Sequence, residues 1–553
     1  MKAVALAAFA LLAHFSSVQA VPAVIPRATA PSIKLDNGTF VGATSGNVNK
    51  WLGIPFAKPP LGDLRFNLPQ PNDPYSGTYT VTSFGKSCPQ QAISLPIVSG
   101  LAQEAIDFIA NSIFGLVFPD DEDCLTVNVF TPTGVTSTSK LPVVAWIFGG
   151  GFELGSPAMY DGSKIVSRSI QIGQPVVYVS MNYRVSAFGF LASKEVKAAG
   201  VGNLGLRDQR EALRWIQKYI TSFGGDPTKV TIWGESAGAI SVAMQMLTNG
   251  GNTEGLFRAG FMESGSPIPV GDITNGQPYY DDLVKRTGCT GASDTLQCLR
   301  SVDYSTLKNA MDQSPGIFAY QQSLVLAWLP RADGDFLPDA PQKLVEQGSV
   351  ANIPFITGDC DDEGTLFSLS TLNITTDAQL QKYINDYFLP KASAADVAKI
   401  LGAYPADITQ GSPFGTSVLN SITPQFKRIA AMQGDLVFNA PRRFFLQQRS
   451  GKQNTWSFLS KRLKALPVLG STHFTDILNV YGGGEMADYL IRFAVNLDPN
   501  GGNLLTWPKY TTASPNLMTF QDGLFEAPLT ITQDTFRTQG FNVLTNLSLA
   551  YPI

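Results

Sequence analysis

The sequence predicts an α/β fold in which helices cover both faces of a large, mainly parallel sheet. Four short, apolar, β-branched runs support this prediction, at residues 141–148, 175–181, 229–233 and 353–357. Between the second run and the third, over residues 207–223, apolar residues recur at helical spacing. Continuous apolar strands that alternate with helices are typical of parallel sheets buried on both faces.

Length and composition indicate a large globular chain. The 553 residues are 44% hydrophobic and 15% charged, whereas an average soluble domain is roughly 25% charged. This composition argues against disorder and supplies enough apolar surface for a sizeable core. No composition break divides the chain, and we expect a single domain over residues 21–553. The net charge of −4 excludes the basic surface that binding of nucleic acid requires.

The N-terminus has the pattern of a secretory signal peptide. Lys2 gives a short positive region, residues 3–15 form an apolar run, and Val18-Gln19-Ala20 is a small-x-small cleavage signature. We therefore expect residues 1–20 to be a signal peptide and the mature protein to be extracellular. The alternative is a buried N-terminal helix. The run is too short to span a membrane, and no later apolar stretch is long enough either. Three sequons fit a glycosylated secreted protein: Asn37, Asn373 and Asn546.

Histidine is scarce in this chain. The sequence has 2 histidines, and His14 lies inside the expected signal peptide. The mature chain therefore keeps one, His473. This excludes a zinc site built on several histidine ligands, and we expect neither a metal ion nor an organic cofactor. It also leaves a single candidate wherever the chemistry needs an imidazole.

The 5 cysteines all lie beyond the signal peptide, and an oxidising compartment favours their pairing. Cys289 and Cys298 are close enough in sequence for a short staple. Cys88 and Cys124 would close a longer loop, which leaves Cys360 unpaired. The spacing keeps other pairings open, since four paired cysteines allow three connectivities.

The segment between Cys88 and Cys124 contains an amphipathic pattern over residues 92–118. Its apolar residues fall on one helical face: Ile106, Ile109, Ile113, Leu116 and Val117. We expect an amphipathic helix here. It is either a surface helix packed on the core or a mobile flap whose apolar face contacts a lipid interface or lines the site.

The pentapeptide Gly234-Glu-Ser-Ala-Gly238 fits the G-x-S-x-G pattern of a nucleophile elbow. Alone the pattern is weak, because a chain this rich in glycine and serine matches it by chance. Its context is specific, since it follows the strand 229–233 and opens a helical run over 239–247. Glycines allow the sharp turn that exposes a strained serine. We therefore expect Ser236 to be a nucleophile rather than part of an ordinary glycine-rich turn.

A serine nucleophile needs a base, and His473 is the one available. It lies in a loop, residues 469–476, after the strand-like segment 455–460. A lone histidine is more often structural than catalytic, but the elbow reverses that expectation. We expect His473 to take the proton of the serine hydroxyl.

The base in turn needs a carboxylate that orients it, and the chain order in such hydrolases is serine, acid, histidine. The acid should therefore follow a strand between the other two residues. The strand 353–357 leads into four candidates: Asp359, Asp361, Asp362 and Glu363. The residues alone do not choose among them.

A glycine triplet follows the strand 141–148. The backbone N–H groups of Gly150 and Gly151 are free of Cβ obstruction, and Ala237 follows the nucleophile directly. These three N–H groups are the expected oxyanion hole. A glycine triplet can also cradle phosphate, but the G-x-x-x-x-G-K-[ST] pattern is missing here, so phosphate binding is discarded.

Together these motifs resemble the type-B carboxylesterases, the cholinesterase-like α/β-hydrolases, over essentially the whole mature chain. Within that family the chain resembles the secreted fungal lipase and sterol-esterase branch most. The motifs are residues 122–129, 149–152, 182–184, 202–209, 234–238, 362–367, 439–445 and 498–500.

The resemblance implies an α/β-hydrolase fold in which residues 88–124 form the lid. It also implies that the acid is Glu363 and that the disulfides are Cys88–Cys124 and Cys289–Cys298. Structural residues follow from it as well: the ion pairs Arg65–Glu122 and Arg184–Asp208, and Ser264 beside the triad.

The chain departs from the family pattern at two positions. Many members have histidine before the glycine triplet, where this chain has Phe148, but the lipase branch shares this feature. Cys360 is not part of the expected pattern. We favour a buried, inert thiol over a redox-sensitive one.

The expected function is a secreted serine ester hydrolase with a lipase or sterol-esterase activity on long-chain fatty esters. The segment between Cys88 and Cys124 has no Trp or Tyr, which argues against a choline site, and the amphipathic lid favours lipids. The alternative is a carboxylesterase acting on short-chain or aryl esters, including feruloyl-type esters. A non-catalytic adhesion protein of this fold is the alternative of another class.

Overall fold

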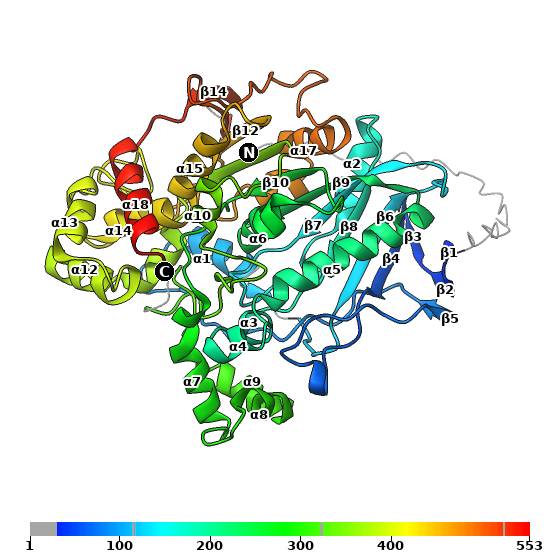
Figure 1. Ribbon diagram of the computed structural model, residues 1–553. Coiled ribbons are helices and arrows are strands. Elements are labelled where there is room, and N and C mark those ends of the chain that lie inside the picture. Colours follow the sequence, from blue (N-terminus) through cyan, green and yellow to red (C-terminus); the bar gives the residue numbers. More distant parts are fainter. Residues whose placement is uncertain (1–29, 113–114, 117, 321–323, 524–525) are drawn as a thin grey trace, which may run out of the picture.

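The computed structural model describes residues 30–112, 115–116, 118–320, 324–523 and 526–553 (Figure 1). The expected signal peptide, residues 1–20, lies outside this part of the chain. Within it, no helix is both long and apolar enough to cross a membrane.

Two sheets organise the described chain. The small one contains β1 (Ser32–Leu35), β2 (Asn37–Val41) and β5 (Ser76–Thr80). The large one contains β3 (Ala43–Ser45), β4 (Val48–Pro55), β6 (Thr126–Pro132), β7 (Leu141–Ile147), β8 (Val177–Met181), β9 (Gly225–Glu235), β10 (Ala259–Glu263), β11 (Phe355–Cys360), β12 (Thr455–Ser460), β13 (Asn516–Phe520) and β14 (Leu529–Gln533).

The large sheet has the order β14-β13-β12-β11-β10-β9-β7-β8-β6-β4-β3. All neighbours from β13 to β8 are parallel, and the pairs at both margins are antiparallel. The four strands expected from the sequence are β7, β8, β9 and β11, which all lie in the parallel centre. The mostly parallel sheet is therefore confirmed. Parallel strands place their carboxyl ends on one edge of the sheet, where loops can bring side chains together.

Helices connect and cover these strands. The longer helices are α1 (Gln103–Asn111), α2 (Gly162–Gln171), α5 (Leu204–Tyr219), α6 (Ala237–Leu247), α7 (Gln277–Arg286), α9 (Tyr304–Met311), α13 (Ala394–Ala403), α14 (Phe426–Gly434), α15 (Ala440–Arg449), α17 (Glu485–Asn496) and α18 (Thr538–Ala550). The shorter ones are α3 (Ser186–Phe190), α4 (Lys194–Ala198), α8 (Thr295–Ser301), α10 (Pro341–Glu346), α11 (Thr365–Ser368), α12 (Asp377–Tyr383) and α16 (Ile477–Tyr481).

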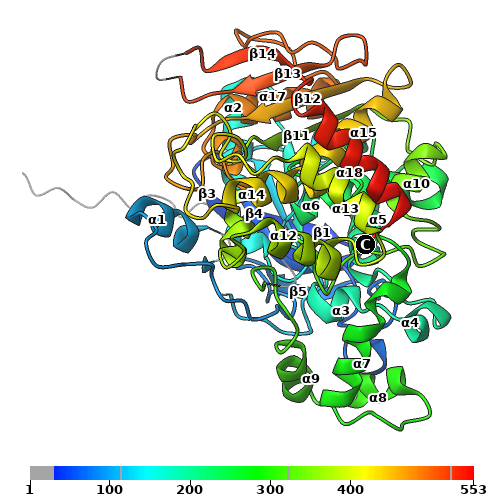
Figure 2. The same ribbon diagram turned by 90° about the vertical axis from the view of Figure 1, so that its left-hand side faces the viewer.

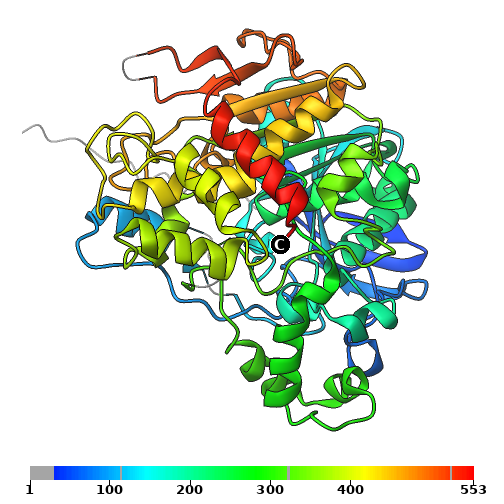
Figure 3. The ribbon, with the colours of Figure 1, turned by 60° about the vertical axis from the view of Figure 1, so that its left-hand side comes forward.

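The helices form layers on the large sheet. In Figure 1, α5 and α6 lie in front of the strands, and α6 packs on β9 and β10. Helices α2 and α17 pack on each other and on β7, β8 and β9 from the other side. Figures 2 and 3 show a further group, α12, α13, α14 and α18, gathered together, and α18 packs on α13 and α15. The core strands are thus buried on both faces, as their continuous apolar runs predict.

The amphipathic helix expected over 92–118 is shorter than predicted. Helix α1 spans Gln103–Asn111, and residues 92–102 have no helical structure. Pro96 and the left-handed Gly100 (φ 89°) stop a helix from forming earlier, because proline lacks the N–H and glycine favours a turn. On the predicted apolar face, Ile109 is buried but Leu116 is 42% exposed. Ile113 and Val117 lie outside the described residues.

Candidate active site

Ser236 occupies a sharp turn between β9 and α6. Its backbone has φ 55° and ψ −123°, a conformation that a residue with a side chain adopts only when its surroundings impose it. The turn also requires glycine on both sides. A Cβ on Gly238 would lie 2.0 Å from the carbonyl oxygen of Ile147, and one on Gly234 would lie 2.4 Å from the backbone of Gly238. The turn therefore has the geometry of a nucleophile elbow.

The loop after β7 lies directly against this turn. A Cβ on Gly149 would be 2.9 Å from the Cβ of Ser236, so only glycine fits the approach. Gly150 and Gly151 follow with φ 113° and 64°. Ala237 is the first residue of α6, where the backbone N–H groups have no partner inside the helix. The three residues expected to supply the oxyanion donors therefore lie in the loop that contacts Ser236 and at the first position of α6.

His473 lies in the loop after β12, and its Nδ1 is 2.5 Å from Oε2 of Glu363. The other oxygen of Glu363 accepts a 2.6 Å hydrogen bond from the backbone N–H of Cys360. The imidazole is fully enclosed, with the rings of Phe438 and Phe367 at centroid distances of 4.7 and 5.3 Å. The carboxylate thus fixes both the orientation of the ring and the tautomer with a proton on Nδ1.

The other three candidate carboxylates, Asp359 within β11 and Asp361 and Asp362 after it, are paired with cations. Asp359 accepts a 2.7 Å hydrogen bond from Nε of the buried Arg442. Asp361 and Asp362 accept 2.8 and 2.6 Å hydrogen bonds from Nζ of Lys464. Of the four candidates that the residues alone left open, only Glu363 is paired with the histidine.

Ser236 and His473 are not joined by a hydrogen bond in this structure. Nε2 of His473 lies 3.3 Å from Oε1 of Glu235, and it has no hydrogen-bond partner among the described residues. Catalytic hydrogen bonds are often long in structures without substrate and tighten only when it binds.

Burial shifts the pKa values of the histidine and its acid in opposite directions. Burial lowers the pKa of His473 to about 4. Burial raises the pKa of Glu363 to about 8, against the hydrogen bonds that it accepts from Ser264 and from the backbone of Cys360. Both shifts follow from the same cause, since removing water disfavours the charged form of either group. The imidazole is therefore neutral at neutral pH, as a general base must be.

A narrow apolar pocket opens beside the oxyanion loop and the elbow. Its free volume is about 40 Å³. The residues that line it come from several elements: Gly151, Phe152, Ala237, Ile240, Ile268, Pro269, Val270, Ile317, Leu324, Leu326, Leu329, Val437, Phe438 and Ile553. A pocket without charged lining residues, placed next to a candidate nucleophile, suits the hydrocarbon part of a substrate.

Comparison with known proteins assigns these features to a family. The model of the carboxylesterase family matches residues 29–536, which is nearly the whole chain. The chain belongs to the carboxylesterase family.

Fungal lipases are similar to this carboxylesterase over almost their full length. Lipase 4 of Diutina rugosa is 45% identical over 94% of this chain and 97% of its own. Secreted lipase 1 of Botryotinia fuckeliana is 43% identical over 95% and 94%. The secreted triacylglycerol lipase LIP1 of Gibberella zeae is 42% identical over 95% and 91%.

Solved structures agree in fold and in reaction class. EstA of Aspergillus niger superposes with a TM-score of 0.79 at 27% identity, over 95% of this chain and 99% of its own. A PNB esterase gives a TM-score of 0.73, also at 27% identity, over 93% and 100%. The carboxylesterase thus has the α/β-hydrolase fold and is a carboxylic ester hydrolase.

The structure adds buried acids that the sequence reasoning missed. Glu235, Glu263 and Asp476 are fully buried; Glu235 and Asp476 lie near the histidine, and Glu263 lies next to both acids. Burial raises the pKa of Glu235 well above its usual range, and the neighbouring carboxyl of Asp476 raises it further. Burial likewise raises the pKa of Asp476 to about 6. Glu235 precedes Ser236 in the elbow motif and Glu263 precedes Ser264, but neither pattern indicates that the acid is buried.

The structural residues implied by the resemblance lie as expected. Both disulfides are present, Cys88–Cys124 and Cys289–Cys298. Cys360 is a free, buried cysteine whose Sγ lies 3.4 Å from Oγ1 of Thr475. Burial raises the pKa of this thiol well above its usual range, so it stays in the unreactive thiol form.

The two predicted ion pairs are also present and buried. Arg65 donates two hydrogen bonds of 2.6 Å to Glu122. Arg184 pairs with Asp208 through bonds of 2.8 and 2.7 Å. Such bidentate pairs fix the loops that carry them.

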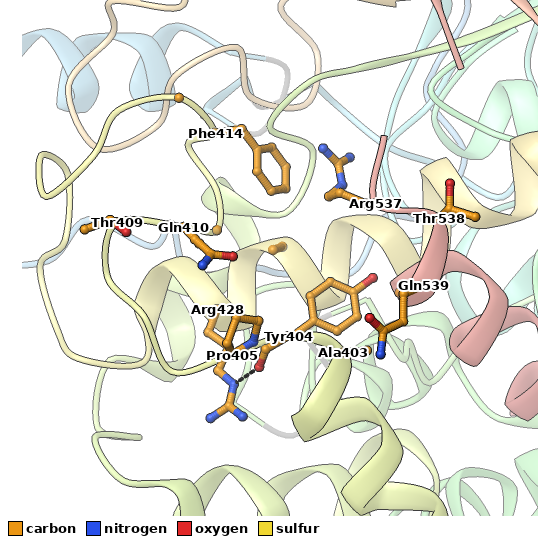
Figure 4. Close-up of a pocket in the computed structure, with 14 residues that line it drawn as sticks. Ala403, Tyr404, Pro405, Thr409, Gln410, Phe414, Arg428, Arg537, Thr538 and Gln539 are labelled. Carbon is orange, nitrogen blue, oxygen red and sulfur yellow. Dashed lines mark hydrogen bonds between the residues drawn. The ribbon is translucent and has the colours of Figure 1, made fainter. Parts of the chain in front are cut away.

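A roomier cavity of about 490 Å³ lies between α13, α14 and α18, and Figure 4 shows the residues that line it. Its lining includes Tyr404, Phe414, Arg428 and Arg537 but none of the candidate catalytic residues. The narrow apolar pocket, which Gly151 and Ala237 line, is therefore the candidate for the ester site.

Proposed function

We propose that this carboxylesterase is a secreted lipase that hydrolyses long-chain fatty esters, such as triacylglycerols and sterol esters, through Ser236, His473 and Glu363. The observation that carries the proposal is the apolar pocket beside the oxyanion loop, which no charged side chain lines. The free energy of binding of an acyl chain becomes more favourable there in proportion to the apolar area that leaves water. The fungal relatives described above, named as lipases, support the same substrate class.

In the proposed acylation step, Oγ of Ser236 attacks the ester carbonyl carbon while its proton passes to Nε2 of His473. The negative charge that develops on the carbonyl oxygen is stabilised by the N–H groups of Gly150, Gly151 and Ala237. Glu363 stabilises the imidazolium through Nδ1. The tetrahedral intermediate then expels the alcohol, which takes the proton from Nε2.

Deacylation repeats this sequence with water as the nucleophile. His473 removes a proton from the water, whose oxygen attacks the acyl-enzyme carbonyl. The second intermediate collapses, Ser236 regains its proton, and the carboxylic acid leaves. The balance is one ester and one water consumed, and one alcohol and one acid formed, with no cofactor in either step.

We further propose that residues 88–124 act as a lid and that the described chain belongs to a single domain, 21–553, behind a signal peptide. Secretion is supported by the secreted relatives and by the two disulfides. The side chains of Asn37, Asn373 and Asn546 are exposed, as glycosylation requires.

The experiment that tests the proposal combines one substitution with one substrate series. Ser236→Ala should abolish hydrolysis, whereas Ser266→Ala, a buried serine outside the proposed triad, should keep it. Wild-type rates should rise with the acyl chain length of p-nitrophenyl esters and increase sharply above the solubility limit. A short-chain optimum with no such increase would instead support the alternative, a carboxylesterase for short-chain or aryl esters.

A further inference from the structure

An uncharged, exposed segment follows α13. From Asp407 to Lys427 the sequence contains no charged residue between these two. Its large apolar side chains are unusually accessible: Ile408 is 41% exposed, Val418 55%, Leu419 68% and Ile422 36%. Single exposed apolar residues are normal on a protein surface, but a group of them in one uncharged segment needs an explanation. We call residues 408–422 the apolar loop.

The conformation of the apolar loop is held by specific bonds. Lys427 is buried, and its Nζ donates to Oγ1 of Thr416 at 2.9 Å and to the carbonyl of Ser417 at 2.6 Å. Ser417 and Asn420 have φ values of 50° and 63°, which cost free energy outside glycine. The exposure of Leu419, which lies between these two residues, therefore follows from a backbone conformation that specific hydrogen bonds hold.

Two further contacts fix the base of the loop. The guanidinium of Arg537 lies 3.8 Å from the ring centroid of Phe414 (Figure 4). Arg537 is itself anchored by a 2.9 Å hydrogen bond to Asp435. The cavity in Figure 4 is thus the space beneath a loop that is attached at both ends.

The apolar loop is bonded to both loops that carry the candidate acid and base. Oγ of Ser412 and the backbone N–H of Phe414 donate to Asp362, the neighbour of Glu363, at 3.0 and 2.8 Å. Oδ1 of Asn420 accepts a 2.9 Å hydrogen bond from the N–H of Val468, on the segment that leads to His473. The loop that carries the exposed side chains is therefore fixed to both segments that carry the candidate acid and base.

The lid helix lies on the same side of the molecule. Figures 2 and 3 both show the yellow segment around residue 415 next to α1. A surface that contacts the apolar loop would therefore also face the proposed lid. The chemistry of the loop points to an uncharged lipid phase, since the nearest cation on its own segment, Lys427, is buried and directed at backbone oxygens. Binding to anionic membranes instead requires exposed lysine and arginine clusters.

We propose that Val418, Leu419 and Ile422 form a second lipid-docking surface, separate from the lid, that seats the enzyme on an uncharged ester droplet. The proposal rests on the lipase function proposed above. Docking through this fixed surface presents the rim of the site to the droplet, and the lid then opens against a surface that is already in contact.

The test uses the full chain with Val418→Ser and Leu419→Ser combined, and a matched control with Leu61→Ser and Leu505→Ser, which are 47% and 40% exposed elsewhere. Binding is measured by flotation with triolein droplets coated with phosphatidylcholine, in the Ser236→Ala background so that the droplets persist. Activity is measured in the Ser236 enzymes on monomeric p-nitrophenyl butyrate.

We expect the droplet concentration for half-maximal binding to rise about fivefold or more in the loop variant and to stay unchanged in the control. Activity on the monomeric ester should be equal in all three. Unchanged droplet binding would overturn the proposal, and so would a parallel loss of activity on the monomeric ester. A wild-type preference for vesicles containing phosphatidylserine, lost in 1 M salt, would show a charge-driven contact and overturn it as well.

Two other outcomes are also decisive. If light scattering shows that the wild type self-associates and the loop variant does not, the apolar loop is a contact between two copies of the chain and the lipid proposal fails. If the wild type hydrolyses only short-chain esters, the lipase function fails, and droplet binding by the loop is still decided separately by flotation.

Discussion

At the scale of single residues, the site depends on groups that are held in otherwise unfavourable states. Ser236 has a strained backbone, and Glu363 and His473 are a buried acid and a buried base. Strain and desolvation both cost stability, and they persist because the surrounding packing fixes them. In the proposed mechanism this packing holds Glu363 and His473 as a pair before the substrate arrives, and the bond between Ser236 and His473 forms when it binds.

The pH dependence of the reaction follows from the Glu363–His473 pair. The proposed mechanism needs an ionised Glu363 and a neutral His473, and burial raises the pKa of Glu363 to about 8. Below that pH the pair holds an extra proton, so kcat/KM for a soluble ester should rise as the pH increases from 5 to 8 and then level off. The measurement is initial rates across this range with the Ser236→Ala enzyme as background. A flat profile between pH 5 and 8 would contradict it.

Gly149 is the position where the smallest change should have the largest effect. A Cβ there would meet Oε2 of Glu235 at 2.6 Å and the Cβ of Ser236 at 2.9 Å. Gly149→Ala should displace the oxyanion loop and lower kcat by about a hundredfold or more, comparable to losing one donor, which costs about 3 kcal/mol. Gly402→Ala is the control, because a Cβ at Gly402 meets nothing within 4 Å. Equal kcat values for both variants would refute the expected contact.

At the scale of elements, the parallel strands and the elbow could be predicted from the sequence, whereas helix α1 was predicted in its place but not in its length. Buried parallel strands give continuous apolar runs, so β7, β8, β9 and β11 are visible in the sequence. The marginal strands β3 and β14 are partly exposed and lack such a run. In the proposed lid, the helical spacing of apolar residues extends beyond α1 on both sides. Gly100 precedes the start of the helix, and the extended backbone of Ser112 ends it.

The residues of the candidate site also fall into those that the sequence predicts and those that it does not. Ser236 and His473 follow from a motif and from the scarcity of histidine, and Glu363 follows from the family resemblance. Glu235, Glu263 and Asp476 could not be predicted, because their role depends on burial, which has no local pattern. The apolar loop also escapes the sequence, since an exposed Leu419 and a core leucine are identical in a hydropathy pattern.

Helix α1 offers a test of the proposed lid. Ile109 is fully buried, and Ile109→Ser removes apolar contact worth about 1–2 kcal/mol from the closed lid. The closed form should become less populated, so activity on monomeric ester should increase several-fold while the rate increase at the solubility limit shrinks. The measurement is rate against ester concentration across that limit. Asn111→Ser, at an exposed position on the same helix, should leave both quantities unchanged; the same rate increase in wild type and Ile109→Ser would contradict a closing role.

At the scale of the whole molecule, buried carboxyl groups determine how stability changes with pH. Burial raises the pKa of Glu153 and Glu363 to about 8, of Asp359 to about 7 and of Asp476 to about 6. In the unfolded chain these groups ionise near pH 4. Between those limits the folded state binds more protons than the unfolded state, so the free energy of unfolding falls as the pH rises.

Glu153 is a buried acid outside the proposed triad, so it tests how such a group changes the free energy of unfolding with pH. Its Oε2 accepts a 2.8 Å hydrogen bond from the N–H of Ile317, and its Oε1 has no partner among the described residues. The stability that it contributes is complete below its unfolded pKa near 4.5 and is lost as the pH rises through about 8, with a slope of at most about 1.4 kcal/mol per pH unit. Glu153→Gln keeps the acceptor but cannot ionise.

The wild-type midpoint of thermal unfolding should therefore fall from pH 5 to pH 8, and the Glu153→Gln variant should fall less steeply, so that its advantage over the wild type grows with pH. Glu346→Gln, at an exposed position, should follow the wild-type slope. Thermal and urea unfolding at each pH supply the measurement. Parallel wild-type and Glu153→Gln curves would mean that Glu153 is ionised in the folded protein, and the unpartnered oxygen would then have to be satisfied by water that reaches the oxyanion loop.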